Sequence, residues 1–190
     1  MSVLHQKALN KLTADTKRFL KDHGLPLSVI GVLKLAVIVE FWAVLHFRLC
    51  EHCMEIPRIL RIPLKLGLAL TKPFVEGMTS SRLRHGAVIG GGLLLHHSMG
   101  VAIAVGAEIG DNCTIFSGVT IAYKGNGLQG GAPRIGNNVR LMAGCKILGN
   151  IIIGNDVVIG ANAVVLKDVP SGSIAVGIPA RVLGHFETTE

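Results

Sequence analysis

The 190-residue chain is 49% hydrophobic and 16% charged, so it can enclose an apolar core, although only 4% of it is aromatic. Its 24 glycines and its excess of valine and isoleucine are typical of short strands joined by tight corners. The net charge of +7 is concentrated in residues 1–82, which hold 12 Lys and Arg against 6 Asp and Glu. This basic part lacks the aromatic residues and motifs of a nucleic-acid surface, which argues against DNA or RNA binding and favours an anionic membrane face or a solvated surface.

The cysteines indicate a reduced, cytoplasmic protein. Cys50, Cys53, Cys113 and Cys145 form no disulfide pattern, and the first apolar run begins too late to be a signal peptide. His46 shares a helical face with Cys50 and Cys53, which could hold zinc as part of a four-ligand site. The simpler interpretation is that these are small apolar residues on a packed helix, and we expect no metal.

Residues 1–80 are predicted to form a helical N-terminal segment. Residues 3–21 place apolar side chains near one stripe with lysines elsewhere, which is the pattern of a short amphipathic helix. Residues 29–45 are almost wholly apolar, but Lys34 and Glu40 interrupt the run. A membrane-spanning helix needs about 20 apolar residues, so we do not expect this segment to span a bilayer.

A second helical run follows Pro57, from Ile59 to Leu70. It carries Arg58, Arg61 and Lys65 beside leucines, so it is amphipathic and basic, like helices that lie on a lipid surface. Alternatively, the N-terminal helices pack against each other or against a symmetry mate.

The rest of the chain repeats. An aliphatic residue recurs every six positions from residue 83, with a two-residue offset after Val101 and an interruption after Ile121. The recurring residues are Leu83, Ile89, Leu95, Val101, Ile103, Ile109, Ile115, Ile121, Ile135, Leu141, Ile147, Ile153, Ile159 and Val165. No amphipathic helix has this spacing, whereas a β-solenoid that turns a corner every six residues does.

The interruption at residues 122–134 (AYKGNGLQGGAPR) is polar, glycine-rich and without period. We expect a loop inserted at a corner of the solenoid, where such loops often form binding surfaces. Residues 186–190 are predicted to be a tail.

Many units fit the pattern Ile-Gly-x-x-small-x, as in residues 153–158 and 159–164. On this pattern, residues 81–185 resemble the hexapeptide-repeat acyltransferases. The resemblance implies a mainly β fold, a left-handed parallel β-helix of triangular section, with the N-terminal helices attached. It also implies a homotrimer or a dimer of trimers. The handedness comes from the resemblance alone, since the general preference for right-handed crossovers would argue the other way.

Two adjacent histidines, His96 and His97, interrupt the apolar repeat. A histidine can take a proton from a hydroxyl near neutral pH. Adjacent residues of a strand point in opposite directions, so if Leu95 faces inward, His96 faces outward and His97 lies nearer a corner. The four histidines of the repeat region show no three-histidine spacing that would indicate zinc.

The strings LLLHHSMGVAIA and IFSGVTIA resemble serine acetyltransferases and, more closely, bacterial O-acetyltransferases of surface-polysaccharide and capsule synthesis of the colanic-acid type. The resemblance implies that His97 is the catalytic base, and it makes His96 a further candidate. Serine acetyltransferases carry Asp in place of His96. They also have an Asp one coil earlier, where this chain has Arg82, and a second active-site histidine where it has Ala132. Without these groups a small zwitterion would be poorly held, so we expect a sugar acceptor.

The donor side has its own signature at Gly177-Ile178-Pro179-Ala180-Arg181, which matches the Gly-x-Pro-Ala-Arg element that closes the solenoid in these enzymes. The resemblance implies that acetyl-CoA lies in a groove between subunits, with no metal. The implied pantetheine contacts are Ala122, Tyr123, Ala143 and Gly144. The candidate phosphate contacts are Lys146, Lys167 and Arg181.

The sequence thus predicts an acetyl-CoA-dependent O-acetyltransferase that acts on a sugar or polysaccharide by histidine general-base catalysis, without an acyl-enzyme. One alternative is a serine O-acetyltransferase of cysteine biosynthesis. An alternative from another class is a non-catalytic structural β-solenoid trimer. We expect a cytoplasmic protein, with peripheral membrane contact through the N-terminal helices as an open alternative.

Overall fold

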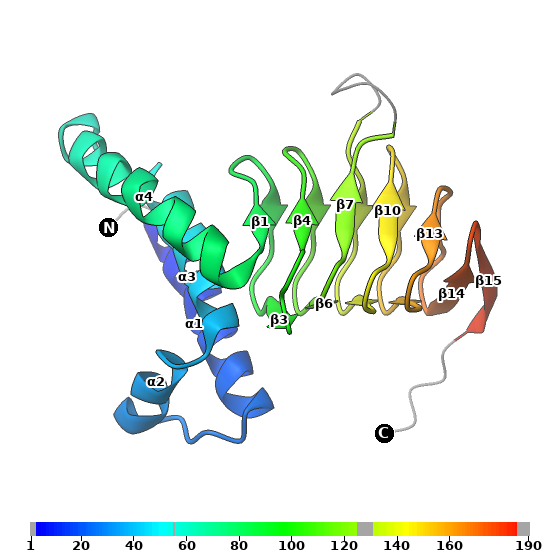
Figure 1. Ribbon diagram of the computed structural model, residues 1–190, viewed down its shortest axis with the longest axis horizontal. Coiled ribbons are helices and arrows are strands. Elements are labelled where there is room, and N and C mark those ends of the chain that lie inside the picture. Colours follow the sequence, from blue (N-terminus) through cyan, green and yellow to red (C-terminus); the bar gives the residue numbers. More distant parts are fainter. Residues whose placement is uncertain (1–2, 55, 125–130, 186–190) are drawn as a thin grey trace.

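A bundle of helices is attached to one end of a three-sided prism of short strands (Figure 1). The computed structural model describes residues 3–54, 56–124 and 131–185. The chain changes from helix to strand between Thr79 and Arg82, next to the boundary predicted at residue 80. The predicted tail at 186–190 and residues 125–130 of the predicted loop lie outside the described residues.

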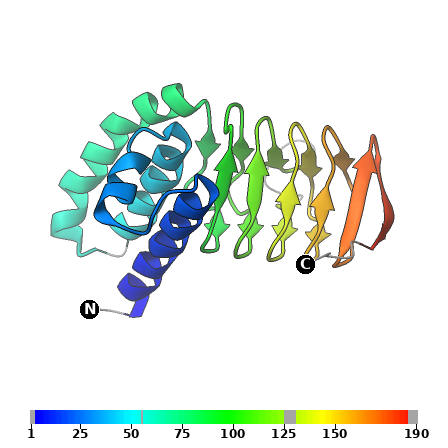
Figure 2. The ribbon, with the colours of Figure 1, turned by 90° about the horizontal axis from the view of Figure 1, so that it is seen from below.

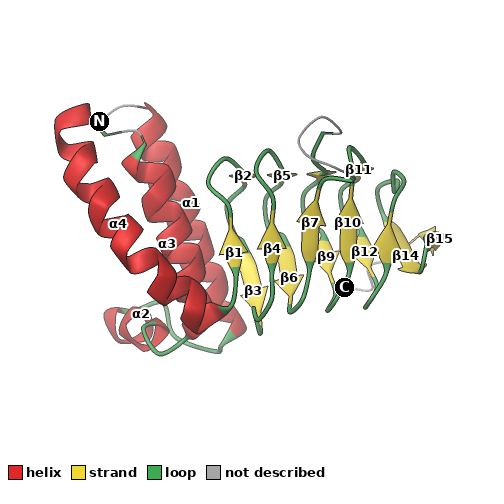
Figure 3. Ribbon diagram, turned by 45° about the horizontal axis from the view of Figure 1, so that its top comes forward, coloured by secondary structure: helices red, strands yellow, loops and turns green. Residues whose placement is uncertain are grey.

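Four helices form the N-terminal part: α1 (Val3–Asp22), α2 (Val29–Leu35), α3 (Val39–Cys53) and α4 (Arg58–Thr79). Successive layers of this bundle stack beside the end of the prism, and α4 is the outermost (Figure 3). No single helix among those described is long and apolar enough to cross a bilayer, whereas α2 and α3 together meet that test with a bend of 96° between them.

The prism has three sheets, in which strands of successive coils pair in parallel, apart from the antiparallel strand β15 at the end of the third sheet (Figure 2). The first sheet contains β1 (Arg82–Leu83), β4 (Ala102–Ile103), β7 (Thr120–Ala122), β10 (Lys146–Leu148) and β13 (Val164–Val165). The second contains β2 (Val88–Ile89), β5 (Glu108–Ile109), β8 (Arg134–Ile135) and β11 (Ile152–Ile153). The third contains β3 (Leu94–His96), β6 (Thr114–Phe116), β9 (Arg140–Leu141), β12 (Val158–Ile159), β14 (Ser173–Gly177) and β15 (Ala180–His185).

The six-residue repeat builds the core, as the sequence predicts. In each strand the repeated aliphatic residue points inward and its neighbours point outward, and equivalent residues of successive coils stack in register. The three internal stacks are Leu83, Ile103, Ile121, Ile147 and Val165; Ile89, Ile109, Ile135, Ile153 and Val169; and Leu95, Ile115, Leu141, Ile159 and Ala175. Among the described residues, the core of the prism is filled by small and aliphatic side chains without an aromatic ring, which explains the scarcity of aromatic residues.

The corners align into three edges along the prism. We call the edge after the third sheet the histidine edge (residues 97–101, 117–119, 143–145 and 161–163). The edge after the first sheet is the loop edge (residues 84–87, 104–107, 122–124, 131–133, 148–151 and 166–168). The third, the asparagine edge, has left-handed backbone at Asn112, Asn138 and Asp156, with φ of 57° at each. Asparagine and aspartate tolerate this conformation better than other residues with a Cβ, which explains their place at these corners.

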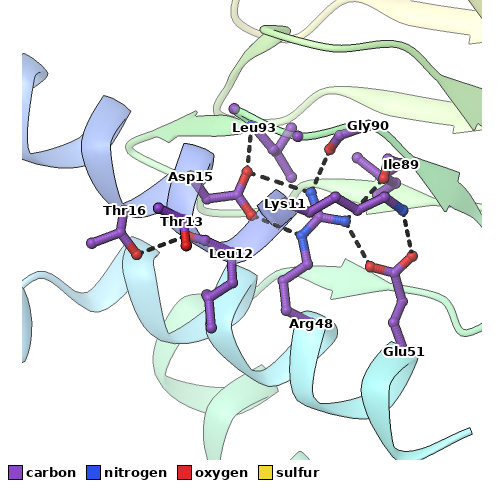
Figure 4. A network of polar contacts seen from close by, with 12 residues as sticks. Lys11, Leu12, Thr13, Asp15, Thr16, Arg48, Glu51, Ile89, Gly90 and Leu93 are labelled. Carbon is purple, nitrogen blue, oxygen red and sulfur yellow. Dashed lines mark hydrogen bonds and ion pairs between the residues drawn. The ribbon is translucent and has the colours of Figure 1, made fainter. Parts of the chain in front are cut away.

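A buried ion pair joins the helices to the first coil of the prism (Figure 4). Arg48 of α3 donates from Nε to Asp15 Oδ2 of α1 at 2.7 Å and from Nη1 to the Ile89 carbonyl at 2.9 Å. The Leu93 N–H donates to Asp15 Oδ1 at 2.7 Å. Glu51 accepts from Arg48 at 2.6 Å and so extends the network toward solvent. The pair therefore satisfies backbone groups that the first coil, with no coil before it, leaves open.

An antiparallel hairpin closes the other end of the prism. The strand β14 pairs with β12 in parallel and with β15 in antiparallel orientation. The turn of this hairpin carries the motif Gly177–Arg181. The motif therefore lies at the end of the solenoid, as the sequence predicts.

Candidate active site

His97 stands at a corner of the prism, directly after β3, with its side chain exposed. Its backbone is left-handed, with φ of 47°. Within the described part of the prism, every other residue with positive φ is Gly, Asn or Asp. A left-handed conformation costs a residue with a larger side chain about 1–2 kcal/mol, and such positions cluster at functional sites. The left-handed backbone at His97 thus lowers the stability of the fold, while the imidazole stays exposed at the histidine edge.

His96 has a different environment. As expected, Leu95 is buried and His96 faces outward. The His96 ring stacks on Phe116 of the next coil, with 4.9 Å between centroids and 12° between planes. His96 Nε2 lies 3.3 Å from Asp22 Oδ1 at the end of α1. The centroids of the His96 and His97 rings are 6.1 Å apart. One imidazole is therefore held by an aromatic ring and a carboxylate, while its neighbour is free to meet a substrate.

Sequence reasoning missed Asp22. It precedes His96 by 74 residues and belongs to the segment that ends the first helix, so no spacing rule connects the two. Only the packing of α1 beside the third sheet brings them together. A carboxylate next to an imidazole fixes the orientation and tautomer of the ring, which is a frequent arrangement around catalytic histidines.

Two of the implied acetyl-CoA contacts, Ala143 and Gly144, lie on the same edge of the prism as His97. Register places His97, Ser117 and Ala143 at equivalent positions of successive coils, so Ala143 lies two coils, or about 10 Å, from the histidine. Gly144 follows with φ of 74°. Its N–H donates to the Ser117 carbonyl, and the Gly118 N–H donates to the Met99 carbonyl, both at 2.8 Å. These amides join the coils, so within one chain neither is free to stabilise an oxyanion.

The other implied contacts belong to the loop edge. Ala122 ends β7, and the Tyr123 hydroxyl donates to the Val105 carbonyl. Ala132, which occupies the position of the second histidine of serine acetyltransferases, lies beside them: a Cβ placed on Gly106 would be 3.6 Å from Tyr123 Oη and 3.8 Å from Ala132 Cβ. A single chain therefore distributes the candidate residues over two separate edges of the prism.

The candidate phosphate contacts also differ in their surroundings. Lys146 Nζ donates to the Gly118 carbonyl at 2.6 Å and to Thr120 Oγ1 at 3.1 Å, so this ammonium is already bound to the prism. Lys167 is exposed beside the loop edge, and Arg181 is exposed in β15. The two exposed cations are thus the ones with freedom to reach a phosphate.

Arg82 occupies the position of the orienting Asp of serine acetyltransferases and begins β1, with its side chain exposed. Its register neighbour is Ala102, in the strand that follows the His97 corner. A guanidinium cannot accept a proton from an imidazole, so Arg82 cannot take the role of that Asp.

The cysteines do not form a site. His46 Nδ1 lies 3.8 Å from Cys50 Sγ, whereas the Cys53 thiol points to the Arg61 carbonyl at 3.8 Å. Among the described residues, no group of three or more His, Cys, Asp and Glu could hold a metal ion. Cys113 and Cys145 lie in the core, where burial raises the pKa of Cys113 to about 11 and that of Cys145 to about 12. These thiols are neutral and serve as small apolar residues.

Comparison with known proteins agrees with this fold. Residues 132–167 match the family described as bacterial transferase hexapeptide (six repeats). Serine acetyltransferase from Helicobacter pylori is 48% identical over 106 residues, which are 56% of this chain and 62% of that protein.

Solved structures extend the similarity to the helices. The serine acetyltransferase of Brucella abortus in complex with coenzyme A has a TM-score of 0.78 at 26% identity, covering 97% of this chain and 70% of that one. Soybean serine acetyltransferase complexed with serine has a TM-score of 0.73 at 30% identity, covering 94% of this chain and 70% of that one.

The prism is a left-handed parallel β-helix of the acetyltransferase type, as the sequence predicts. It carries an exposed histidine at one corner. The chain belongs to the hexapeptide-repeat transferase family, and serine acetyltransferases are its homologues. The expected closer relation to polysaccharide enzymes of the colanic-acid type is not supported by these relatives. The chain spans less than two thirds of the length of the curated relatives described here.

Proposed function

We propose that the protein is an acetyl-CoA-dependent O-acetyltransferase in which His97 is the general base. The observation that carries the proposal is the exposed His97 imidazole at a corner, held there by a left-handed backbone that only glycine, asparagine and aspartate adopt elsewhere in the described prism. Membership of the hexapeptide-repeat transferases and the similarity to a relative solved with coenzyme A support it.

The chemistry follows from these groups. The neutral His97 imidazole accepts the proton of an acceptor hydroxyl while the hydroxyl oxygen attacks the thioester carbonyl of acetyl-CoA. The C–S bond of the tetrahedral intermediate then breaks, and the imidazolium returns the proton to the CoA thiolate. No acyl-enzyme is needed. His96, oriented by Asp22, lies beside the base and helps to position the acceptor.

The donor groove is proposed to form between protomers. Ala143 and Gly144 share the edge of His97, whereas Ala122 and Tyr123 lie on the loop edge of the same chain. A trimer that places the loop edge of one protomer against the histidine edge of the next would complete the site. The small side chains at both edges leave room for an extended pantetheine arm, and Lys167 and Arg181 are exposed for its phosphates.

Serine is the first candidate acceptor, because the relatives described above are serine acetyltransferases and one of them was solved with serine. Two positions favour a second candidate, a sugar hydroxyl such as that of a surface polysaccharide. Arg82 and Ala132 stand where serine acetyltransferases carry polar groups of the active site. A chain without them has fewer partners for the charges of an amino acid.

A thiol-release assay tests both candidates. Acetyl-CoA is supplied with L-serine or with neutral and acidic oligosaccharides, and CoA release is followed with a thiol reagent. The proposed activity predicts release with at least one hydroxyl acceptor and loss of release in His97→Ala. Release with serine alone would exclude the sugar acceptor.

The non-catalytic alternative gives a different result. Acetyl-CoA would leave the Tm unchanged, and no acceptor would release CoA. Either His97→Ala with full turnover or this double failure would refute the proposed function.

A further inference from the structure

The helix α4 turns an apolar stripe to solvent. Ile59, Ile62, Leu66, Leu70 and Phe74 are between 63% and 86% exposed. Their spacing of three and four residues places them on one side of the helix, which we call the α4 face. A monomeric soluble protein rarely exposes so many large aliphatic side chains together, so the α4 face is built to be covered.

The rest of the chain covers only the opposite side of α4. His46 of α3 contacts the Leu68 carbonyl at 3.1 Å, and Lys72, Val75 and Glu76 border a small cavity against α3. The helix is the outermost layer of the bundle, and only its C-terminal part lies near the first coil of the prism (Figure 3). Packing of the helices against each other thus accounts for the polar side of α4 and leaves its apolar side open.

The charge of α4 indicates what kind of surface covers the α4 face. The helix α4 contains four cations, Arg58, Arg61, Lys65 and Lys72, against one acidic residue, Glu76, which lies 3.8 Å from Lys72. Residues 1–82 as a whole carry 12 Lys and Arg against 6 Asp and Glu. A second copy of this chain would bring a surface of the same sign against the α4 face. An anionic phospholipid surface would attract it.

A groove adjoins the α4 face. It has a volume of about 1100 Å³ and lies between α3, α4 and the first coil, with Ile62 and Leu66 on one wall and Cys50 and Met54 on the other. Its lining is largely apolar, and its charged residues are Lys65, Lys72 and Glu51, of which Glu51 is paired with Arg48 and Lys11. Acyl chains beneath the α4 face can enter this groove while the lysines meet the phosphates.

We propose that the α4 face binds the surface of an anionic phospholipid bilayer, with α4 lying in the plane of the interface. The helix does not cross the membrane; apolar side chains enter the acyl boundary and the cations contact headgroups. The inference rests on α4 alone and is independent of the acetyl-transfer activity.

Vesicle flotation of the full chain tests it. Wild-type protein is mixed with phosphatidylcholine vesicles that contain 30% phosphatidylserine, or with phosphatidylcholine alone. We expect binding to the anionic vesicles that weakens in 0.5 M NaCl. The variant Ile62→Glu/Leu66→Glu should bind at least tenfold more weakly. The variant Arg58→Gln/Lys65→Gln, which leaves the apolar stripe intact, should bind about thirtyfold more weakly.

Ile152→Glu is the matched control, because Ile152 is an exposed aliphatic residue on β11 of the prism. It should bind vesicles as the wild type does. Circular dichroism identifies any variant that fails to fold, and Arg58→Gln/Lys65→Gln changes only exposed side chains.

The proposal is overturned if wild-type protein stays unbound to anionic vesicles. It is also overturned if the wild type does not bind vesicles and Ile62→Glu/Leu66→Glu has a lower mass in solution than the wild type. A second copy of the chain would then cover the α4 face. Thiol release by His97 with a soluble acceptor is measured without vesicles, so either proposal can fail while the other stands.

Discussion

The helical part and the prism solve the same problem, burial of an apolar core, in opposite ways. In the prism each coil repeats the one before it, and inward aliphatic residues and hydrogen bonds between coils recur at every step. In the helical part nothing repeats, and three different sets of contacts join the helices to the prism: Arg48 with Asp15 and Glu51, Arg18 with Cys113 and Thr114, and Asp22 with His96. Stability in the prism is thus divided among many equivalent contacts, while attachment of the helices depends on a few unique ones.

This comparison is tested most strongly by removing Arg48. Arg48→Ala leaves the Asp15 carboxylate buried without its cation, so we expect a loss of about 3–5 kcal/mol in the free energy of unfolding. Ile115→Val in the core of the prism should cost only about 0.5–1.5 kcal/mol. Chemical denaturation monitored by circular dichroism measures both. Equal losses would show that the helices do not depend on this network.

The second prediction concerns His97, which belongs to the surface of the prism. His97→Ala should lower kcat by at least about a hundredfold, because general-base catalysis contributes about 10²–10⁴ in rate, and leave the Tm within a few degrees. Asn137→Ala is the control, since Asn137 lies at the asparagine edge, away from both edges that form the proposed site. A similar loss in the control would point to a general effect on the prism.

The third prediction crosses from the helices to the prism. Asp22→Asn removes the carboxylate beside His96 and keeps its shape, so we expect kcat to fall about tenfold, equivalent to about 1.4 kcal/mol, with little change in KM for acetyl-CoA. Lys17→Ala, at an exposed position of the same helix, should leave kcat unchanged. Unchanged turnover in Asp22→Asn would make this contact purely structural.

The smallest effect is expected at the asparagine edge. Asn137 Oδ1 accepts from the Asp111 N–H at 2.8 Å, and Asn155 Oδ1 accepts from the Asn137 N–H in the same way. Asn137→Ala should cost about 1 kcal/mol, because it removes one link of this series.

Glu108→Ala serves as the control for this edge. It breaks an exposed ion pair with Arg134, with 3.6 Å between Glu108 Oε1 and Arg134 Nε, and should change stability by less than about 0.5 kcal/mol. Denaturant midpoints compare the two variants, and a larger loss in Glu108→Ala would reverse the ranking of corner and surface contacts.

The prism could be predicted because its information is periodic. A residue such as Leu141 has the same role as Ile115 and Ile159, so each confirms the others, and the position of His97 at a corner follows from Leu95 facing inward. The sequence also predicted the helices at residues 3–21 and 59–70, although α4 continues to Thr79.

Contacts that occur once could not be predicted. Arg48 and Asp15 are 33 residues apart, and Asp22 and His96 belong to different parts of the chain. Nothing in the local sequence marks a partner for a single buried charge, because the partner is chosen by how the helices pack. For the same reason the sequence could not show that the ammonium of Lys146, a predicted phosphate contact, is bound to Gly118 and Thr120 within the prism.

The antiparallel hairpin of β14 and β15 has a consequence for how such a chain can change in length. A parallel stack whose final strand is unpaired would offer a template on which other chains could polymerise. Here the antiparallel strand β15 blocks that growth at one end, and the helices block it at the other. The hairpin contacts the last turns of the prism, and the helices contact the first turns, where Arg18 of α1 reaches Cys113 and Thr114 of the second turn. Duplication of an internal turn would therefore lengthen the rod without disturbing either terminus, which leaves the number of turns open to evolution.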